Sequence, residues 1–163
     1  MKRFALLAGV AVLMVLMFSA GWLVARTGVG AGADRASLTD MERAFADRME
    51  SSSLVGYFTV DGRANDGGGR PDRYDIASVT KVDNGRWRFD VRMRHSTVDL
   101  TVPVAVPVSW VGDTPMIDMT DLELPGVGTF TTRVFFYGDR YAGTWQSGTV
   151  GGHMYGKIEK QQK

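Results

Sequence analysis

The run "NGRWRFDVRMR", residues 84–94, decides the fold because its side chains alternate in character. Four apolar residues share one face of this run: Trp87, Phe89, Val91 and Met93. The charged residues between and after them share the other face: Arg88, Asp90, Arg92 and Arg94. A period of two residues is that of a β-strand with one buried and one solvated face. We therefore predict a strand here, with its arginines in solvent.

Asn84-Gly85 predicts a hairpin before this strand, because both central positions of a type I′ turn need a positive φ. A two-residue turn at this point sets the register with the preceding strand. The expected pairs are Asp83 with Arg86, Val82 with Trp87, and Asp75 with Arg94. Opposite charges then lie opposite each other on the outer face, which supports the assignment.

Two more hairpins are expected near the end of the chain. Gly138-Asp139 fits a type II′ turn, which places Gly143 opposite Val134 and Phe136 opposite Tyr141. The stretch "YAGTWQSGTVGGHMYGKI", residues 141–158, is rich in glycine. A phosphate-binding glycine loop is followed by a helix, but here the sequence alternates instead. We therefore interpret Gly151-Gly152 as the second turn. Its expected inner pairs are Trp145 with Ile158 and Thr149 with Met154, and the expected outer residues are His153, Tyr155 and Lys157.

The run "TVDLTVPVAVPVSW", residues 97–110, predicts a strand that lacks backbone hydrogen-bond donors along one edge. Its expected inner face consists of Val102, Val104, Val106, Val108 and Trp110. Pro103 and Pro107 remove two N–H donors from the same edge, which favours an edge strand or an interrupted one. The next run, residues 116–126, predicts a strand of unbroken alternation. In total we expect eight or nine strands at hairpin spacing, hence a mainly β fold with an antiparallel barrel or sandwich over residues 52–163.

The N-terminal stretch predicts membrane contact. Residues 4–25 carry no charge, and as a helix they span about 33 Å, close to the hydrocarbon core of a bilayer. We expect residues 1–25 to be a transmembrane anchor, with the β domain outside the cytoplasm. Ala31-Gly32-Ala33 also fits signal cleavage, which would leave a secreted or periplasmic protein.

Between anchor and sheet we expect a flexible linker, residues 26–36, and one short amphipathic helix, residues 37–51. Thr39 and Glu42 form the spacing of a capping box. The expected apolar stripe consists of Leu38, Met41, Phe45 and Met49. Such a helix packs on a sheet or covers one end of a barrel; the alternative is a helix that lies on a membrane or binds a partner.

Composition limits the chemistry. The chain has no cysteine, which excludes disulfides, thiolate metal sites and a cysteine nucleophile. A formal net charge of +1 without a basic cluster argues against nucleic acid. The segment 61–72 fails the calcium-loop spacing and predicts a mobile loop. His95 and His153 are expected at the surface, so we expect neither a metal nor a cofactor.

Four stretches resemble a group of uncharacterised exported bacterial proteins that has no assigned activity. They begin with "LVGYFTVDG" and "RYDIASVTKV" and continue through residues 113–145 and "GGHMYGKIE", so the likeness covers most of residues 54–159. Gly143-Thr144-Trp145 is also similar to the Gly-x-Trp motif that lipocalins and avidins carry on their first strand. The resemblance implies an exported, lipocalin-like β domain and names no reaction.

We therefore expect a membrane-anchored binding module for a small apolar ligand or a protein partner. The candidate ligand-binding aromatics are Trp87, Phe89, Trp110, Tyr141 and Trp145. The alternatives are an envelope hydrolase that uses His153, Tyr155 and Lys157, or a purely structural module. An interior cavity lined by aromatic residues would favour binding, whereas a cleft where His153 meets a carboxylate would favour catalysis.

Overall fold

The computed structural model describes residues 32–63, 68–82, 85–95, 98–124 and 128–162. The expected membrane anchor, residues 1–25, and residues 26–31 of the expected linker lie outside this range. Within the described part of the chain, no helix combines the length and the apolar character that a membrane span requires.

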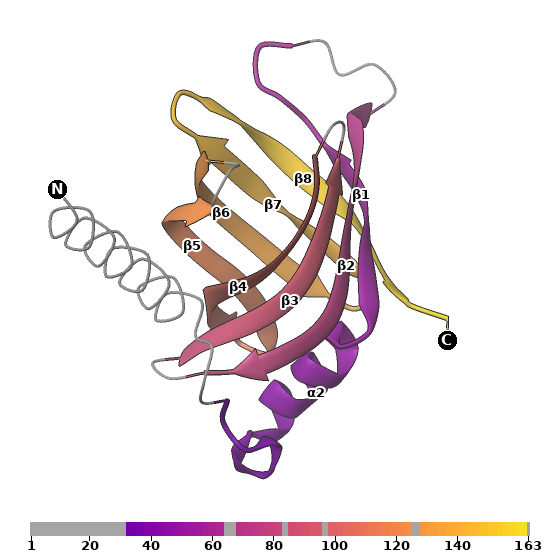
Figure 1. Cartoon of the computed structure of the whole chain (residues 1–163), viewed down its shortest axis with the longest axis vertical. Coiled ribbons are helices and arrows are strands. Elements are labelled where there is room, and N and C mark those ends of the chain that lie inside the picture. Colours follow the sequence, from indigo (N-terminus) through magenta and orange to yellow (C-terminus); the bar gives the residue numbers. More distant parts are fainter. Residues whose placement is uncertain (1–31, 64–67, 83–84, 96–97, 125–127, 163) are drawn as a thin grey trace, which may run out of the picture.

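The described residues form eight strands that close into one barrel (Figure 1). The strands are β1 (Ser52–Phe58), β2 (Arg70–Lys81), β3 (Arg86–His95), β4 (Val98–Val111), β5 (Thr114–Leu124), β6 (Gly128–Tyr137), β7 (Arg140–Ser147) and β8 (Val150–Lys160). Each strand pairs antiparallel with the next, and β8 pairs with β1. The expected antiparallel β fold is confirmed, and it is a barrel rather than a sandwich.

One helix, α2 (Asp40–Met49), lies across one end of the barrel (Figure 1). It begins with the expected capping box: Thr39 Oγ1 accepts from the backbone N–H of Glu42, and the Glu42 carboxylate accepts from the N–H of Thr39. The buried face follows Phe45, Ala46 and Met49. The expectation that Met41 belongs to this face is wrong, because Met41 lies about a quarter turn from its centre and is 49% exposed.

The short 3-10 helix η1 (Arg35–Ser37) precedes α2. Arg35 forms ion pairs with Asp47 and Glu50, one helix length away in the sequence. The Ala33 N–H also donates to the Lys81 carbonyl, and Asp34 caps η1. Residues 33–36 of the linker expected at 26–36 are therefore part of the folded structure.

The end of the barrel beneath α2 is filled by aromatic rings. Phe45 is 1% exposed, and its ring centre lies 5.3 Å from that of Trp87 and 5.9 Å from those of Trp110 and Phe136. The contacts with both tryptophans are edge-to-face, the arrangement that aromatic quadrupoles favour. The helix thus acts as a plug whose single ring completes the core at this end.

The β2–β3 hairpin lies where it was expected, but its register differs. The Val82 N–H donates to the carbonyl of Arg86, so three residues rather than two separate the paired positions. Gly85 has a φ of +70°, as the last residue of a three-residue hairpin loop requires. A bulge at Ala77 then shifts the ladder once more, so that Asp75 lies opposite Arg92 and not Arg94.

The β6–β7 hairpin agrees with the expectation in both turn and register. Tyr137 pairs with Arg140 across Gly138-Asp139, Val134 lies opposite Gly143, and Phe136 lies opposite Tyr141. Gly138 has a φ of +58°, while Asp139 is not in the positive region, as a type II′ turn requires.

The β7–β8 turn is not at Gly151-Gly152, as expected, but at Gly148-Thr149, since Ser147 pairs with Val150. Gly148 has a φ of +58°, like the first glycine of the preceding hairpin. Trp145 therefore lies opposite Gly152 rather than Ile158. The displaced glycines have another role: a Cβ on Gly152 would lie 2.0 Å from the Thr59 carbonyl oxygen, so the backbones approach too closely for a side chain.

Strand β4 carries the incomplete edge that its prolines predict. Residues 98–107 of β4 pair with β3, and among the described residues only Val108–Val111 pair with β5. Four pairs thus close the barrel at this seam, and the two strands diverge beyond them (Figure 1).

Strand β5 does not keep the expected unbroken alternation. Its ladder with β6 shifts between Met119 and Leu122, and Asp121 has a φ of +49°. The bulge carries Leu122 onto the same face as Met119, so that the apolar residues on both sides of it pack against the core.

Candidate ligand-binding cavity

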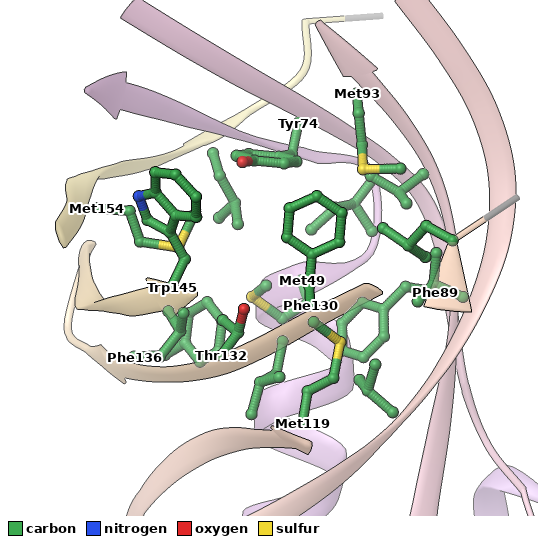
Figure 2. A pocket seen from close by; sticks show the side chains of 18 of the residues that line it. Met49, Tyr74, Phe89, Met93, Met119, Phe130, Thr132, Phe136, Trp145 and Met154 are labelled. Carbon is green, nitrogen blue, oxygen red and sulfur yellow. The ribbon is translucent and has the colours of Figure 1, made fainter. Parts of the chain in front are cut away.

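The barrel interior beyond the plug is hollow. A cavity of about 240 Å³ extends from Met49 of α2 along the inner faces of all eight strands (Figure 2). Its lining is Met49, Leu54, Phe58, Tyr74, Ile76, Phe89, Val91, Met93, Val104, Val106, Ile117, Met119, Leu124, Phe130, Thr132, Val134, Phe136, Trp145 and Met154. None of these side chains carries a charge, so the cavity presents apolar surface interrupted by two hydroxyl groups.

Local sequence patterns explain why these side chains point inward. Val104 and Val106 follow from the alternation of β4, in which the flanking Pro103 and Pro107 are exposed. Elsewhere a bulge shifts which residues of a strand face inward. The bulge at Ala77 keeps both Ile76 and Val79 in the core, and the bulge in β5 does the same for Met119 and Leu122. The cavity wall therefore depends on irregular strands as well as on regular ones.

Four methionines form a large share of the lining. Met49 comes from α2, Met93 from β3, Met119 from β5 and Met154 from β8, and Figure 2 shows them around the hollow. Methionine is unbranched and polarisable, so it adapts to irregular shapes and to different ligands. A wall of this kind can adjust to an occupant without a change in the backbone.

Trp145 lies at the wall with its polar atom already satisfied. Its indole N–H donates to the Thr59 carbonyl at 3.1 Å, and its ring packs edge-on against Phe58 with centres 6.1 Å apart. Gly152 opposite leaves room for the ring. The indole therefore offers the cavity only its apolar surface.

Polar groups gather at one part of the wall, around Asp72. This carboxylate is 4% exposed and accepts a hydrogen bond from the Tyr141 hydroxyl at 3.3 Å. Burial, followed by the charge of Asp72, raises the pKa of Tyr141 and raises that of Tyr74 well above its usual value. Asp72 was expected in a mobile loop, residues 61–72, but Arg70, Pro71 and Asp72 belong to β2. The Tyr141 hydroxyl solvates one oxygen of this carboxylate, which lowers the cost of its burial on an inward face.

The Tyr141 ring covers a pair of glycines. Gly56 on β1 lies opposite Gly156 on β8, and a Cβ on either would lie within 3 Å of Tyr141 side-chain atoms. A large ring over glycines is a device by which sheets bend into a barrel. Tyr141 thus has two roles: its ring packs over the glycines where the sheet bends, and its hydroxyl hydrogen-bonds to Asp72.

The structure separates the five aromatic residues expected to bind ligand. Phe89 and Trp145 line the cavity. Trp87 and Trp110 pack against Phe45 in the filled end, and Tyr141 is buried beside Asp72. Sequence reasoning missed the four methionines, together with Tyr74 and Phe130. Parity on the strands could have suggested Met93, Met119, Met154 and Phe130, whereas the inward position of Leu124 depends on the bulge in β5.

The alternative catalytic cluster lies outside the barrel. His153, Tyr155 and Lys157 are exposed on the outer face of β8, as the alternation predicts. The Tyr155 hydroxyl donates to the Gly68 carbonyl, and within the described residues no carboxylate is paired with His153. The backbone of His95 lies opposite Asp72 in the β2–β3 ladder, and its side chain is outside the described part.

Several arginines of the outer face are held in ion pairs. Asp75 lies between Arg73 and Arg94, and Arg92 forms two hydrogen bonds with Asp99 at 2.7 and 2.6 Å. Burial raises the pKa of Asp75, but hydrogen bonds from Ser53, Arg73 and Arg94 outweigh it and lower the pKa below 3.8. Among the described residues, no group of three or more His, Asp or Glu is arranged for a metal ion.

Comparison of the chain with protein-family models, with curated proteins and with solved structures found no match. The geometry of the cavity is therefore the basis for a functional conclusion.

Proposed function

We propose that this barrel binds a small apolar ligand in its interior and performs no chemistry on it. The observation that carries the proposal is the uncharged cavity of about 240 Å³. Apolar ligand surface gains about 25 cal/mol for each Å² removed from water. Eight-stranded barrels have an interior that either fills with side chains or holds one small ligand, and here only the α2 end is filled.

The lining supports a small molecule over a protein partner as the occupant. Its apolar side chains face the barrel interior, where a folded partner has no access. The hydroxyls of Tyr74 and Thr132 can orient a bound molecule, as the few polar groups of ligand pockets usually do. The four methionines favour a site that accepts related molecules of different shape.

The location is part of the same proposal. We infer from the uncharged residues 4–25 that the chain is anchored in a membrane with its barrel outside the cytoplasm. Because the chain has no cysteine, Thr149→Cys in the exposed β7–β8 turn would be its only thiol. A membrane-impermeant maleimide should label it in cells whose cytoplasmic membrane is intact. Labelling only after that membrane is lysed would contradict this orientation.

Binding can be measured through the methionines themselves. We would label the full chain with ¹³C-methyl methionine, place it in phosphatidylcholine nanodiscs and add 1-octanol. The methyl signals of Met49, Met93, Met119 and Met154 should shift and saturate, while that of the exposed Met41 should not.

A matched pair of variants controls this measurement. Val104→Phe adds a ring inside the cavity and should weaken octanol binding about tenfold or more, because the space is occupied. Val111→Phe makes the same change on the exposed part of β4 and should leave binding unchanged. Absence of saturable shifts in the unmodified chain, or equal effects of both variants, would overturn the proposal.

A further inference from the structure

We propose that the α2 end of the barrel rests on the membrane that anchors the chain, and that an apolar patch over β4, β5 and β6 contacts the lipid. The cavity extends toward the far end, where Phe58 and Leu124 line it as the last residues of β1 and β5. That end then faces away from the bilayer. The inference rests on the membrane anchoring proposed above, and it adds an interaction surface with its partner.

The strand register defines the patch on the outer surface. Phe135 of β6 lies opposite Met116 of β5, and Tyr137 follows Phe135 by two residues on the same face. Val111 of β4 lies opposite Thr114, two residues from Met116. Val111, Phe135 and Tyr137 are 59%, 41% and 75% exposed. With Met116 they form the β4–β6 patch, an exposed apolar surface of the kind that marks an interaction site.

The β4–β6 patch lies at the α2 end. Val111 and Tyr137 are the last residues before the β4–β5 and β6–β7 turns. In this antiparallel barrel both turns share one end with the β2–β3 turn. Helix α2 covers that end (Figure 1), and its Arg48 donates to the Gly138 carbonyl of the β6–β7 turn at 3.2 Å.

The chain that leads to the anchor joins the barrel at the same end. The Ala33 N–H donates to the carbonyl of Lys81, at the β2–β3 hairpin, at 2.7 Å. Seven peptide steps separate Ala25 from Gly32, and whatever their conformation they span at most about 25 Å. A strand of the length of β3, tilted as in other barrels, gives the wall a height of about 25 Å. The far end could therefore face the bilayer only with these residues fully extended along the wall.

The chemistry of the β4–β6 patch suits a bilayer surface. Tyrosine is enriched at membrane interfaces, where its ring lies among apolar groups and its hydroxyl among the headgroups. Charged side chains beside the patch occur as pairs of opposite sign, Arg133 with Asp118 and Arg140 with Asp139. Anionic lipids are attracted by clusters of unpaired basic residues. We therefore expect zwitterionic phosphatidylcholine to be a sufficient partner.

The orientation can be measured with a single probe, because the chain has no cysteine. We would attach the fluorophore NBD to Val111→Cys or to Val150→Cys in the full chain, in phosphatidylcholine nanodiscs whose headgroups carry a nitroxide quencher. Both substitutions replace an exposed valine beside a two-residue turn, at opposite ends of the barrel. Interfacial apolar residues lie about 5–10 Å into the headgroup region. The Val111 probe should therefore lose most of its fluorescence, and the Val150 probe should keep it.

Tyr137→Ser tests whether the β4–β6 patch itself holds the barrel on the lipid. In the chain with the Val111 probe, it should restore most of the lost fluorescence. Tyr57→Ser is the matched control, since it makes the same change at a tyrosine that is 44% exposed on β1, outside the patch. It should leave the quenching unchanged.

Equal quenching of the two probes, or stronger quenching at Val150, would overturn the orientation. Quenching at Val111 that is insensitive to Tyr137→Ser would overturn the lipid contact and leave the β4–β6 patch for a protein partner. Octanol binding is read separately, from the methionine signals. Its absence would refute the proposed ligand binding, while the quenching would still decide how the barrel stands on the membrane.

Discussion

The two parts of the barrel interior are built on the same strands and are filled differently. At the α2 end, Phe45 is fully buried among aromatic rings. Further along, the inward side chains are mostly aliphatic residues, methionines and aromatics that surround a cavity of about 240 Å³. The difference is the helix: where an outside element supplies a ring, the barrel is packed, and where none does, it is hollow. Stability should therefore depend on the filled end and binding on the hollow part.

The largest effect should follow from removal of the plug ring. Phe45→Ala should lower the free energy of unfolding by about 3–5 kcal/mol, because a fully buried ring leaves a cavity among four aromatic neighbours. Phe130→Ala, at the wall of the existing cavity, should cost less than half as much. Urea unfolding followed by circular dichroism would measure both.

A milder variant keeps this comparison testable if Phe45→Ala does not fold. Phe45→Leu should still cost more than Phe130→Leu. Equal losses at the two positions would mean that the hollow part contributes as much to stability as the filled end, against our interpretation.

A smaller effect is expected from two adjacent glycines of β8. Gly152→Ala should lower the free energy of unfolding by about 1–3 kcal/mol, since its Cβ would overlap the Thr59 carbonyl at 2.0 Å. Gly151→Ala should cost clearly less, because the nearest atom to its Cβ is the Trp145 carbonyl oxygen at 3.1 Å. Thermal unfolding of the two variants would rank them, and the reverse order would contradict the close approach of Gly152 to Thr59.

The ion pair between Glu42 of α2 and Lys81 of β2 should make the stability of the protein depend on pH in the acid range. Burial raises the pKa of Glu42, but hydrogen bonds with Lys81 and Thr39 outweigh it and hold the pKa below 4.5. A carboxyl group whose pKa is lower in the folded than in the unfolded state stabilises the fold at pH values above its unfolded-state pKa. This stabilisation is lost as the pH falls through its folded-state pKa. Glu42→Gln should therefore cost about 0.5–1 kcal/mol at pH 7, and the loss should shrink below pH 4.5. Glu159→Gln, exposed on β8, is the control, and a pH-independent loss would exclude this explanation.

The sequence contained enough to predict most of the barrel but little of the cavity. Alternation located the strands, Gly138-Asp139 determined one register, and Thr39 marked the start of α2. Registers failed where two turns compete, as at Gly148-Thr149, or where a bulge intervenes, as at Ala77. A hollow interior is not encoded by alternation, because the same inward pattern serves a packed core. It depends on summed side-chain volumes and on where the helix ends.

The smallest effect on stability, and the one that concerns the hollow part most directly, should come from the prolines of β4. Pro103 and Pro107 lie in the stretch that pairs only with β3, beside cavity residues Val104 and Val106. Replacing both prolines with valine restores two N–H donors at an exposed edge and should change the free energy of unfolding by no more than about 0.5 kcal/mol.

The restored donors should instead promote association between chains, because an edge that can both donate and accept pairs readily with another strand. Sedimentation velocity should therefore show concentration-dependent self-association of the double variant. Thr101→Val is the matched control, since it adds a valine to the same exposed face of β4 without a new donor. If the double variant stays as monodisperse as the control, the prolines do not protect this edge. The open seam beside the cavity would then need another explanation, such as a requirement for space where ligands pass between β4 and β5.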